Sequence, residues 1–177
     1  ATGWLAQHTV QDTALLPGTA FVELALCAGR TVGCDRLEEL TLHEPLLLPD
    51  DSTVQMQIAV GPAGQDGRRE VSVHSRTGEA PWTRHAFGLL TPTAAPAPAP
   101  ATQPWPPGDA RPIDLTGFYE RLEQAGYGYG PAFRGLTRAW RSGDELFADI
   151  TLPQPADTPD GEAQYGLHPA LSDAALH

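Results

Sequence analysis

A proline-rich segment divides the chain into two parts and constrains its possible folds more than any other feature. Eight prolines lie between residues 92 and 112, mixed with many alanines. Proline fixes φ and removes a backbone donor, so this composition predicts an extended, semi-rigid linker without a core of its own. We therefore predict an N-terminal unit over residues 1–91, a Pro/Ala-rich linker over 92–112 and a C-terminal unit over 113–177.

The N-terminal unit reads as one helix followed by strands. Pro17 suits the first helical position, where its missing N–H costs nothing, and Gly29 is a plausible stop. Phe21, Leu24 and Ala25 lie between them at helical spacing. Strand patterns follow over residues 37–48, 54–60, 71–73 and 82–90. A single helix covered by an antiparallel sheet is an α+β arrangement.

The C-terminal unit repeats parts of this plan. We predict a helix from about residue 114 to Gly126, a Gly/Tyr-rich loop over 126–135, and two strands joined by a turn at 142–144. A second proline-led helix starts at Pro169. Aligning Pro169 with Pro17 suggests two copies of one α+β fold.

Composition excludes several classes of function. The chain of 177 residues has 11 basic and 22 acidic side chains, a formal net charge of −11, and every basic residue is Arg. An acidic chain is a poor candidate for binding nucleic acid or an anionic membrane. There is no apolar run of the roughly 18 residues that span a bilayer, and no signal-peptide pattern. Cys27 and Cys34 have neither zinc nor CxxC spacing, so we predict reduced cysteines in a cytoplasmic protein. Since the chain begins with Ala1 and ends at His177 inside a helical pattern, we expect a piece of a longer protein.

A few polar residues could carry chemistry. His8 precedes the first helix, while Asp173 and His177 are four residues apart and share one face of the second. Each also has an ordinary interpretation: a capping histidine, and an i,i+4 pair worth a few tenths of a kcal/mol. Together with Asp12 they could ligate a metal, but no dense ligand motif is present, and we predict no metal site. Tyr129, in the glycine-rich loop, could simply belong to a packed turn.

Three segments decide between these interpretations. WLAQHTVQDTALLPGTAFVELAL (4–26), GYGYGPAFRGL (126–136) and LHPALSDAALH (167–177) occur in this order along the chain. They resemble three motifs of the dehydratase domains of modular (type I) polyketide synthases, and the resemblance spans nearly the whole chain. In the first motif, His-x3-Gly-x4-Pro, His8 and Pro17 match, and the third motif carries the family's catalytic aspartate, here Asp173.

The resemblance implies a double hot-dog fold, in which two sheets each wrap a long helix. The second hot dog would be truncated at the C-terminus. It also implies a hydro-lyase that removes water from a β-hydroxyacyl thioester on an acyl carrier protein, giving an α,β-unsaturated thioester in polyketide biosynthesis. No cofactor is expected in this domain, because the substrate is carried on the carrier's phosphopantetheine arm. The expected partners are the carrier, the neighbouring ketosynthase, acyltransferase and ketoreductase domains, and a second copy in a homodimer.

The resemblance also assigns roles to residues. His8 and Asp173 would face each other across a substrate tunnel as base and acid, with His177 orienting the acid or the hydroxyl. A histidine suits the base because its ordinary pKa lies near neutrality. Tyr129 would line the pocket. Backbone N–H groups around Pro17 and Gly18 would stabilise the developing negative charge on the thioester oxygen.

Asp12 departs from the family pattern, because it occupies the position of the motif glycine. Aspartate tolerates left-handed backbone angles better than most residues, so the local backbone can survive the change. Its carboxylate would add bulk and negative charge near the oxyanion. We therefore predict that Asp12 lowers activity unless its side chain points away from the site.

Three alternatives stay open at this stage. The first is a catalytically impaired or inactive relative that serves as a structural or interaction module; Asp12 favours it, and intact His8 and Asp173 oppose it. The second is an isomerase or pyran-forming cyclase on the same fold. The third is a carrier-binding or acyl-binding module without chemistry.

Overall fold

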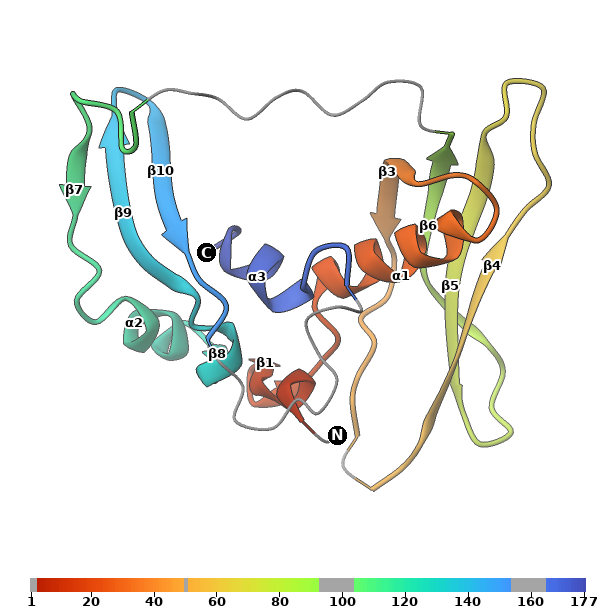
Figure 1. Cartoon of the computed structure of the whole chain (residues 1–177). Coiled ribbons are helices and arrows are strands. Elements are labelled where there is room, and N and C mark those ends of the chain that lie inside the picture. The colour runs from red at the N-terminus through yellow and green to blue at the C-terminus, as the bar shows by residue number, and fades with distance from the viewer. Residues whose placement is uncertain (1–2, 50, 93–103, 154–164) are drawn as a thin grey trace.

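Two antiparallel sheets lie on opposite sides of the molecule, with helices between them (Figure 1). The structure is a computed structural model that describes residues 3–49, 51–92, 104–153 and 165–177. Helix α1 (Gly18–Arg30) belongs to the first half of the chain and α3 (Pro169–Ala174) to the second, and the two helices contact each other. The predicted α+β class is confirmed.

The first sheet covers α1 and has the strand order β3-β6-β5-β4. Its strands are β3 (Arg36–Leu42), β4 (Val54–Val60), β5 (Arg69–Thr77) and β6 (Thr83–Thr91). The four predicted strands are all present, but the first ends at Leu42 rather than at residue 48. Residues beyond it leave the sheet, because Leu46 and Leu48 form backbone hydrogen bonds with the segment that precedes α1.

Packing between α1 and this sheet forms the core. Phe21 and Ala25 of the helix are buried with Val73 of β5 and Leu90 of β6. Along β5, buried and less buried side chains alternate, as expected when one face of a strand meets a helix. Burying a side chain such as Phe21 contributes about 1.5–3 kcal/mol. The core therefore fixes α1, and the residues that immediately precede it, relative to the sheet.

The second sheet has the order β10-β9-β7. The strands are β7 (Arg111–Ile113), β9 (Leu136–Ser142) and β10 (Glu145–Ile150), and the predicted turn joins β9 to β10. Strand β7 includes residues 111 and 112, which the sequence pattern placed at the end of the linker. The predicted linker residues 93–103 lie outside the described part of the chain, and the three-part division stays a prediction.

Helix α2 (Phe118–Gln124) begins four residues later than the sequence indicates. The side chain of Asp114 accepts a hydrogen bond from the Thr116 amide at 2.8 Å, which forms a local turn instead of a helix start. Gly117 then adopts a φ of 67°, outside the helical range. The predicted helix is present, and the side-chain turn at Asp114 delays its first residue.

The Gly/Tyr-rich segment is not a simple loop, contrary to the prediction. It contains strand β8 (Tyr127–Tyr129) and a 3-10 turn, η2 (Pro131–Phe133). Strand β8 pairs with β1 (His8–Val10), which also pairs with β2 (Thr13–Ala14). A short 3-10 helix, η1 (Trp4–Gln7), leads into β1. The two halves of the chain are thus joined by backbone hydrogen bonds within one small sheet.

Glycines permit this close approach of β8 to β1. A Cβ atom on Gly128 would lie 2.2 Å from Oγ1 of Thr9, and one on Gly130 would lie 2.7 Å from Cβ of Gln7. Both separations are far shorter than van der Waals contact. The motif therefore needs glycine at these two positions for the halves to come together.

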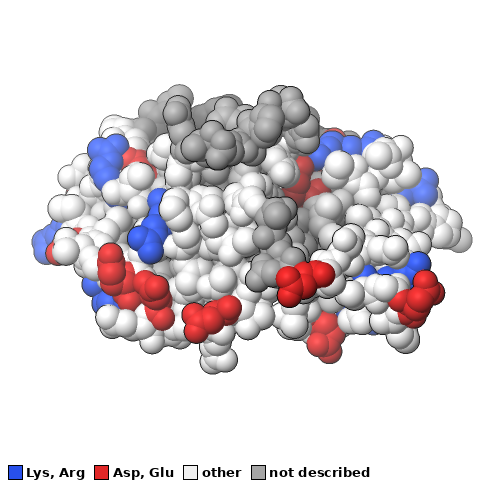
Figure 2. Space-filling view, turned by 90° about the horizontal axis from the view of Figure 1, so that it is seen from below, with Lys and Arg blue, Asp and Glu red and all other residues white. Residues whose placement is uncertain are grey.

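The charge distribution follows the net acidity of the chain. Figure 2 shows acidic side chains in separate groups across one face, with basic side chains mainly toward its edges. Within the part of the chain that the structure describes, no helix is long and apolar enough to cross a membrane.

Candidate active site

His8 lies on β1 with its ring held in one orientation. Nδ1 is 3.0 Å from the carbonyl oxygen of Leu15, and the residue is only 8% exposed. A carbonyl oxygen can only accept, so Nδ1 carries the proton and donates it to this hydrogen bond. In the neutral ring, Nε2 is therefore the atom with a free lone pair. The hydrogen bond to Leu15, the residue after β2, thus selects the tautomer and leaves Nε2 as the basic nitrogen.

Asp173 on α3 faces that nitrogen. Its Oδ2 lies 3.8 Å from Nε2 of His8, and the residue is 7% exposed. The predicted pair, 165 positions apart in the sequence, is thus brought together in space. The separation exceeds that of a direct hydrogen bond.

His177 supports Asp173 from the next turn of the chain. Its Nε2 is 3.3 Å from Oδ2 of Asp173, and its side chain is 2% exposed. Its Nδ1 is buried and has no hydrogen-bond partner among the described residues. Within the described part of the chain, no group of three or more His, Cys, Asp or Glu side chains is placed to hold a metal ion.

Tyr129 completes this cluster from β8. It pairs directly with His8 across the small sheet, and its ring centre is 5.7 Å from that of His8 and 4.0 Å from that of His177. Burial raises the pKa of Tyr129, and the nearby charge of Asp173 raises it further. Tyr129 therefore remains a neutral phenol that can donate a hydrogen bond.

A cavity lies beside His8, at the start of α1. Its volume is about 310 Å³, and it is lined by His8, Gly18, Phe21 and the segment from Leu42 to Pro45. Pro17 caps the helix and Gly18 is its first residue. The first N–H groups of a helix lack intrahelical partners and carry partial positive charge. The predicted oxyanion region and the predicted base therefore border one cavity.

Asp12 is placed apart from this cluster. It is the second central residue of the two-residue β1–β2 turn, where Gln11 has a φ of 47° and Asp12 a φ of 61°. Paired left-handed residues match the twist of a hairpin, which explains why glycine suits this position. Asp12 is exposed, and within the described residues no hydrogen bond or ion pair joins it to His8, Asp173 or Gly18.

The structure adds residues that the sequence did not single out. Phe133 is fully buried, and its ring centre is 5.2 Å from that of His8. Tyr119 packs its ring on His177 and accepts a hydrogen bond from the Leu136 amide. Gln7 accepts one from the Ala132 amide at 2.8 Å. The second motif contains Phe133, but nothing in its spacing identifies that ring as the packing partner of His8.

Comparison with known families agrees with this arrangement. One family model, described as "Polyketide synthase dehydratase domain", matches residues 1–76. A second, described as "Polyketide synthase dehydratase N-terminal domain", matches residues 97–177. Together they cover most of the chain and include His8 and Asp173.

Two curated relatives are similar over almost the whole chain. The spectinabilin polyketide synthase system protein NorB of Streptomyces orinoci is 53% identical over 175 residues, which are 98% of this chain and 8% of that protein. The pikromycin polyketide synthase component PikAII of Streptomyces venezuelae is 51% identical over 178 residues, 98% of this chain and 5% of that protein. The chain thus spans a small fraction of the length of these relatives.

Solved structures give the same result for the fold. The dehydratase domain from the terminal module of the rifamycin polyketide synthase is 44% identical with a TM-score of 0.89, and 98% of this chain covers 64% of that one. The erythromycin dehydratase is 39% identical with a TM-score of 0.87, and 98% of this chain covers 63% of it. These similarities confirm the double hot-dog fold. The chain therefore belongs to the family of polyketide synthase dehydratase domains.

Proposed function

We propose that this chain removes water from a β-hydroxyacyl thioester held on an acyl carrier protein. The observation that carries the proposal is the opposition of two buried groups from the two halves, with Nε2 of His8 and Oδ2 of Asp173 separated by 3.8 Å. A base and an acid at this spacing can act on adjacent carbon atoms of one substrate.

In this proposal His8 is the general base. Its Nδ1 proton is held by the Leu15 carbonyl, so the Nε2 lone pair accepts the proton from the carbon next to the thioester. The C–H bond breaks and its electron pair moves toward the thioester carbonyl. Charge then develops on the thioester oxygen, where N–H groups at the start of α1, near Gly18, stabilise it.

Asp173 acts as the acid on the neighbouring carbon. It delivers a proton to the β-hydroxyl as the C–O bond breaks, so the oxygen leaves as water and a carbon–carbon double bond remains. His177 holds the carboxyl group through the 3.3 Å contact, and Tyr129 offers a phenol donor to the same region. After the step, a protonated His8 faces an ionised Asp173, and exchange of one proton restores the starting state.

The substrate and partners in this proposal come from the family. The relatives are polyketide synthases, and we propose that this chain works beside ketosynthase, acyltransferase and ketoreductase domains and as a homodimer. The thioester arrives on the phosphopantetheine arm of the carrier, and no cofactor takes part in the proposed steps.

Mass spectrometry of the carrier tests the proposal directly. The carrier is loaded with a 3-hydroxyacyl group and incubated with the chain; we expect the acyl mass to fall by one water, and His8→Gln to slow this reaction about 10²- to 10⁴-fold. Unchanged acyl mass with the native chain would support an inactive module. Full binding of the acyl carrier without turnover would support a binding module. Migration of the double bond in an enoyl substrate would favour the isomerase alternative.

Asp12→Gly tests the departure from the family motif. Asp12 is exposed at the hairpin turn, so we expect the variant to turn over within about 2-fold of the native rate and to be at least as stable, because glycine adopts positive φ without strain. Steady-state kinetics and thermal unfolding measure the two quantities. If the turnover rate instead rises by about an order of magnitude or more, the Asp12 carboxylate opposes charge development in the site.

A further inference from the structure

A buried carboxylate on α1 contacts the segment that leads into α3. Glu23 is 8% exposed, and its Oε1 accepts hydrogen bonds from the Gly166 amide and from the guanidinium of Arg30, each at 2.9 Å. A side-chain carboxylate from the first half of the chain is thus bonded to the backbone of the second half, across 143 positions of sequence.

The carboxylate is well suited to remain charged in this place. Burial tends to raise the pKa of Glu23, but hydrogen bonds from Gly166, Arg30 and the Leu167 amide outweigh it and hold the pKa below its ordinary value. Hydrogen bonds to an ionised acceptor are about twice as strong as those between neutral groups. The contact therefore anchors the Gly166 amide to α1.

Further contacts hold the same segment at the start of α3. The hydroxyl of Thr19 donates to the Pro169 carbonyl at 3.0 Å, and the ring of Trp4 lies 4.7 Å from that of His168. Helix α3 has only six residues, so Asp173 is about one turn from this anchored start. A displacement of residues 166–168 would be carried to the carboxyl group of Asp173 with little attenuation.

We infer that Glu23 is a positioning residue, which sets the distance between Asp173 and His8 by fixing the start of α3 against α1. The inference rests on the proposed function for the roles of Asp173 and His8. It adds a residue that lies outside the cluster around the acid and acts only through the helix. Misplacing a reacting group by about 1 Å can reduce the rate roughly 10²-fold.

Two substitutions at this position separate positioning from general stability. Glu23→Met has a similar volume but cannot accept a hydrogen bond, and we expect kcat to fall about 10- to 100-fold with KM within about 3-fold of the native value. Glu23→Gln retains an oxygen that accepts from the Gly166 amide, and we expect it to recover kcat to within about 3-fold of the native value. Gly166→Pro removes the donated N–H and also places its ring against the Glu23 and Arg30 side chains, so kcat should fall at least as far as in Glu23→Met.

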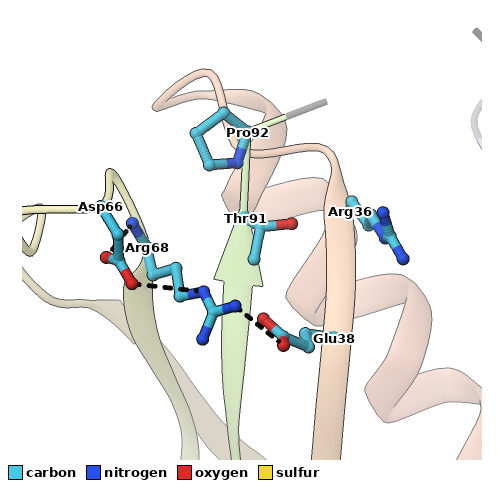
Figure 3. A pocket seen from close by; sticks show the side chains of 6 residues that line it. All are labelled: Arg36, Glu38, Asp66, Arg68, Thr91 and Pro92. Carbon is cyan, nitrogen blue, oxygen red and sulfur yellow. Dashed lines mark hydrogen bonds and ion pairs between the residues drawn. The ribbon is translucent and has the colours of Figure 1, made fainter. Parts of the chain in front are cut away.

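The exposed ion pair in Figure 3 provides a matched control. The guanidinium of Arg68 forms two ion pairs. Its Nη2 is 3.1 Å from Oε1 of Glu38, on strand β3, and its Nε is 3.3 Å from Oδ2 of Asp66, in the loop before β5. Glu38→Met also removes one carboxylate from an Arg pair, but this carboxylate has no hydrogen bond to the start of α3 among the described residues. We expect native kcat and KM.

Hydrogen exchange provides a readout that does not depend on turnover. In Glu23→Met, amides in residues 165–175 should exchange faster, while those of β5 and β6 keep their native protection. Native kcat in both Glu23→Met and Gly166→Pro would overturn the inference, as would a Glu23→Gln variant as slow as Glu23→Met. If His8→Gln turns over at the native rate, the proposed function fails instead, whatever the Glu23 variants do.

Discussion

Asp173→Asn should reduce kcat about 10²- to 10⁴-fold, the range typical of losing one general acid. Asparagine keeps the size of the side chain and an oxygen that can still contact Nε2 of His177, so the local packing should survive. It cannot deliver a proton to the leaving hydroxyl. Steady-state kinetics with a 3-hydroxyacyl thioester measures the loss, and thermal unfolding checks that the fold is retained.

Asp144→Asn is a suitable control for this substitution. Asp144 is exposed in the turn between β9 and β10, so the same change of charge should leave the turnover rate within about 2-fold of native. A loss of less than about 10-fold in Asp173→Asn would contradict the assignment of this residue as the acid. The base at His8 would then need a different proton donor.

Gly128→Ala, on strand β8, should lower both stability and kcat. The added Cβ would lie 2.2 Å from Oγ1 of Thr9, so either the Thr9 side chain must rotate or β8 must move away from β1. Overpacking of this kind costs about 1–3 kcal/mol of stability. Because Tyr129 pairs with His8 through the same strands, we also expect kcat to fall roughly 10²-fold. Chemical denaturation and steady-state kinetics measure the two effects.

A second substitution can relieve this clash. Thr9→Ala removes Oγ1, and the closest remaining atom to the new Cβ, the Thr9 Cβ, is 3.5 Å away, an ordinary contact. The double variant should therefore recover most of the stability and kcat, while Thr9→Ala alone should stay close to native. A double variant as impaired as Gly128→Ala would show that the strand spacing does not cause the loss.

Local sequence patterns predicted most of the first half and the main elements of the second. Pro17 marked the start of α1 to within one residue, and alternation marked β4, because both signals depend on neighbours in the chain. The start of α2 was misplaced, since the choice between a helix and a side-chain turn at Asp114 rests on a single hydrogen bond.

Local sequence patterns predicted less of the candidate active site than of the fold. Strand β8 has only three residues, and its partner β1 is more than a hundred positions away in the sequence. No local periodicity therefore predicts that the two strands pair. The approach of Asp173 to His8 was expected only from the resemblance to a family. No local pattern marks Glu23 on α1, because its hydrogen-bond partner in the second half lies at residue 166.

The joining of β1 to β8 affects the order of events during biosynthesis. At translation rates of roughly 5–20 residues per second, Tyr129 of β8 emerges about 6–24 seconds after His8. During that interval α1 and the first sheet can condense into a stable unit, but β1 has only its short hairpin partner β2. A nascent chain therefore exposes an unpaired edge of β1 beside the imidazole of His8 until β8 has been synthesised.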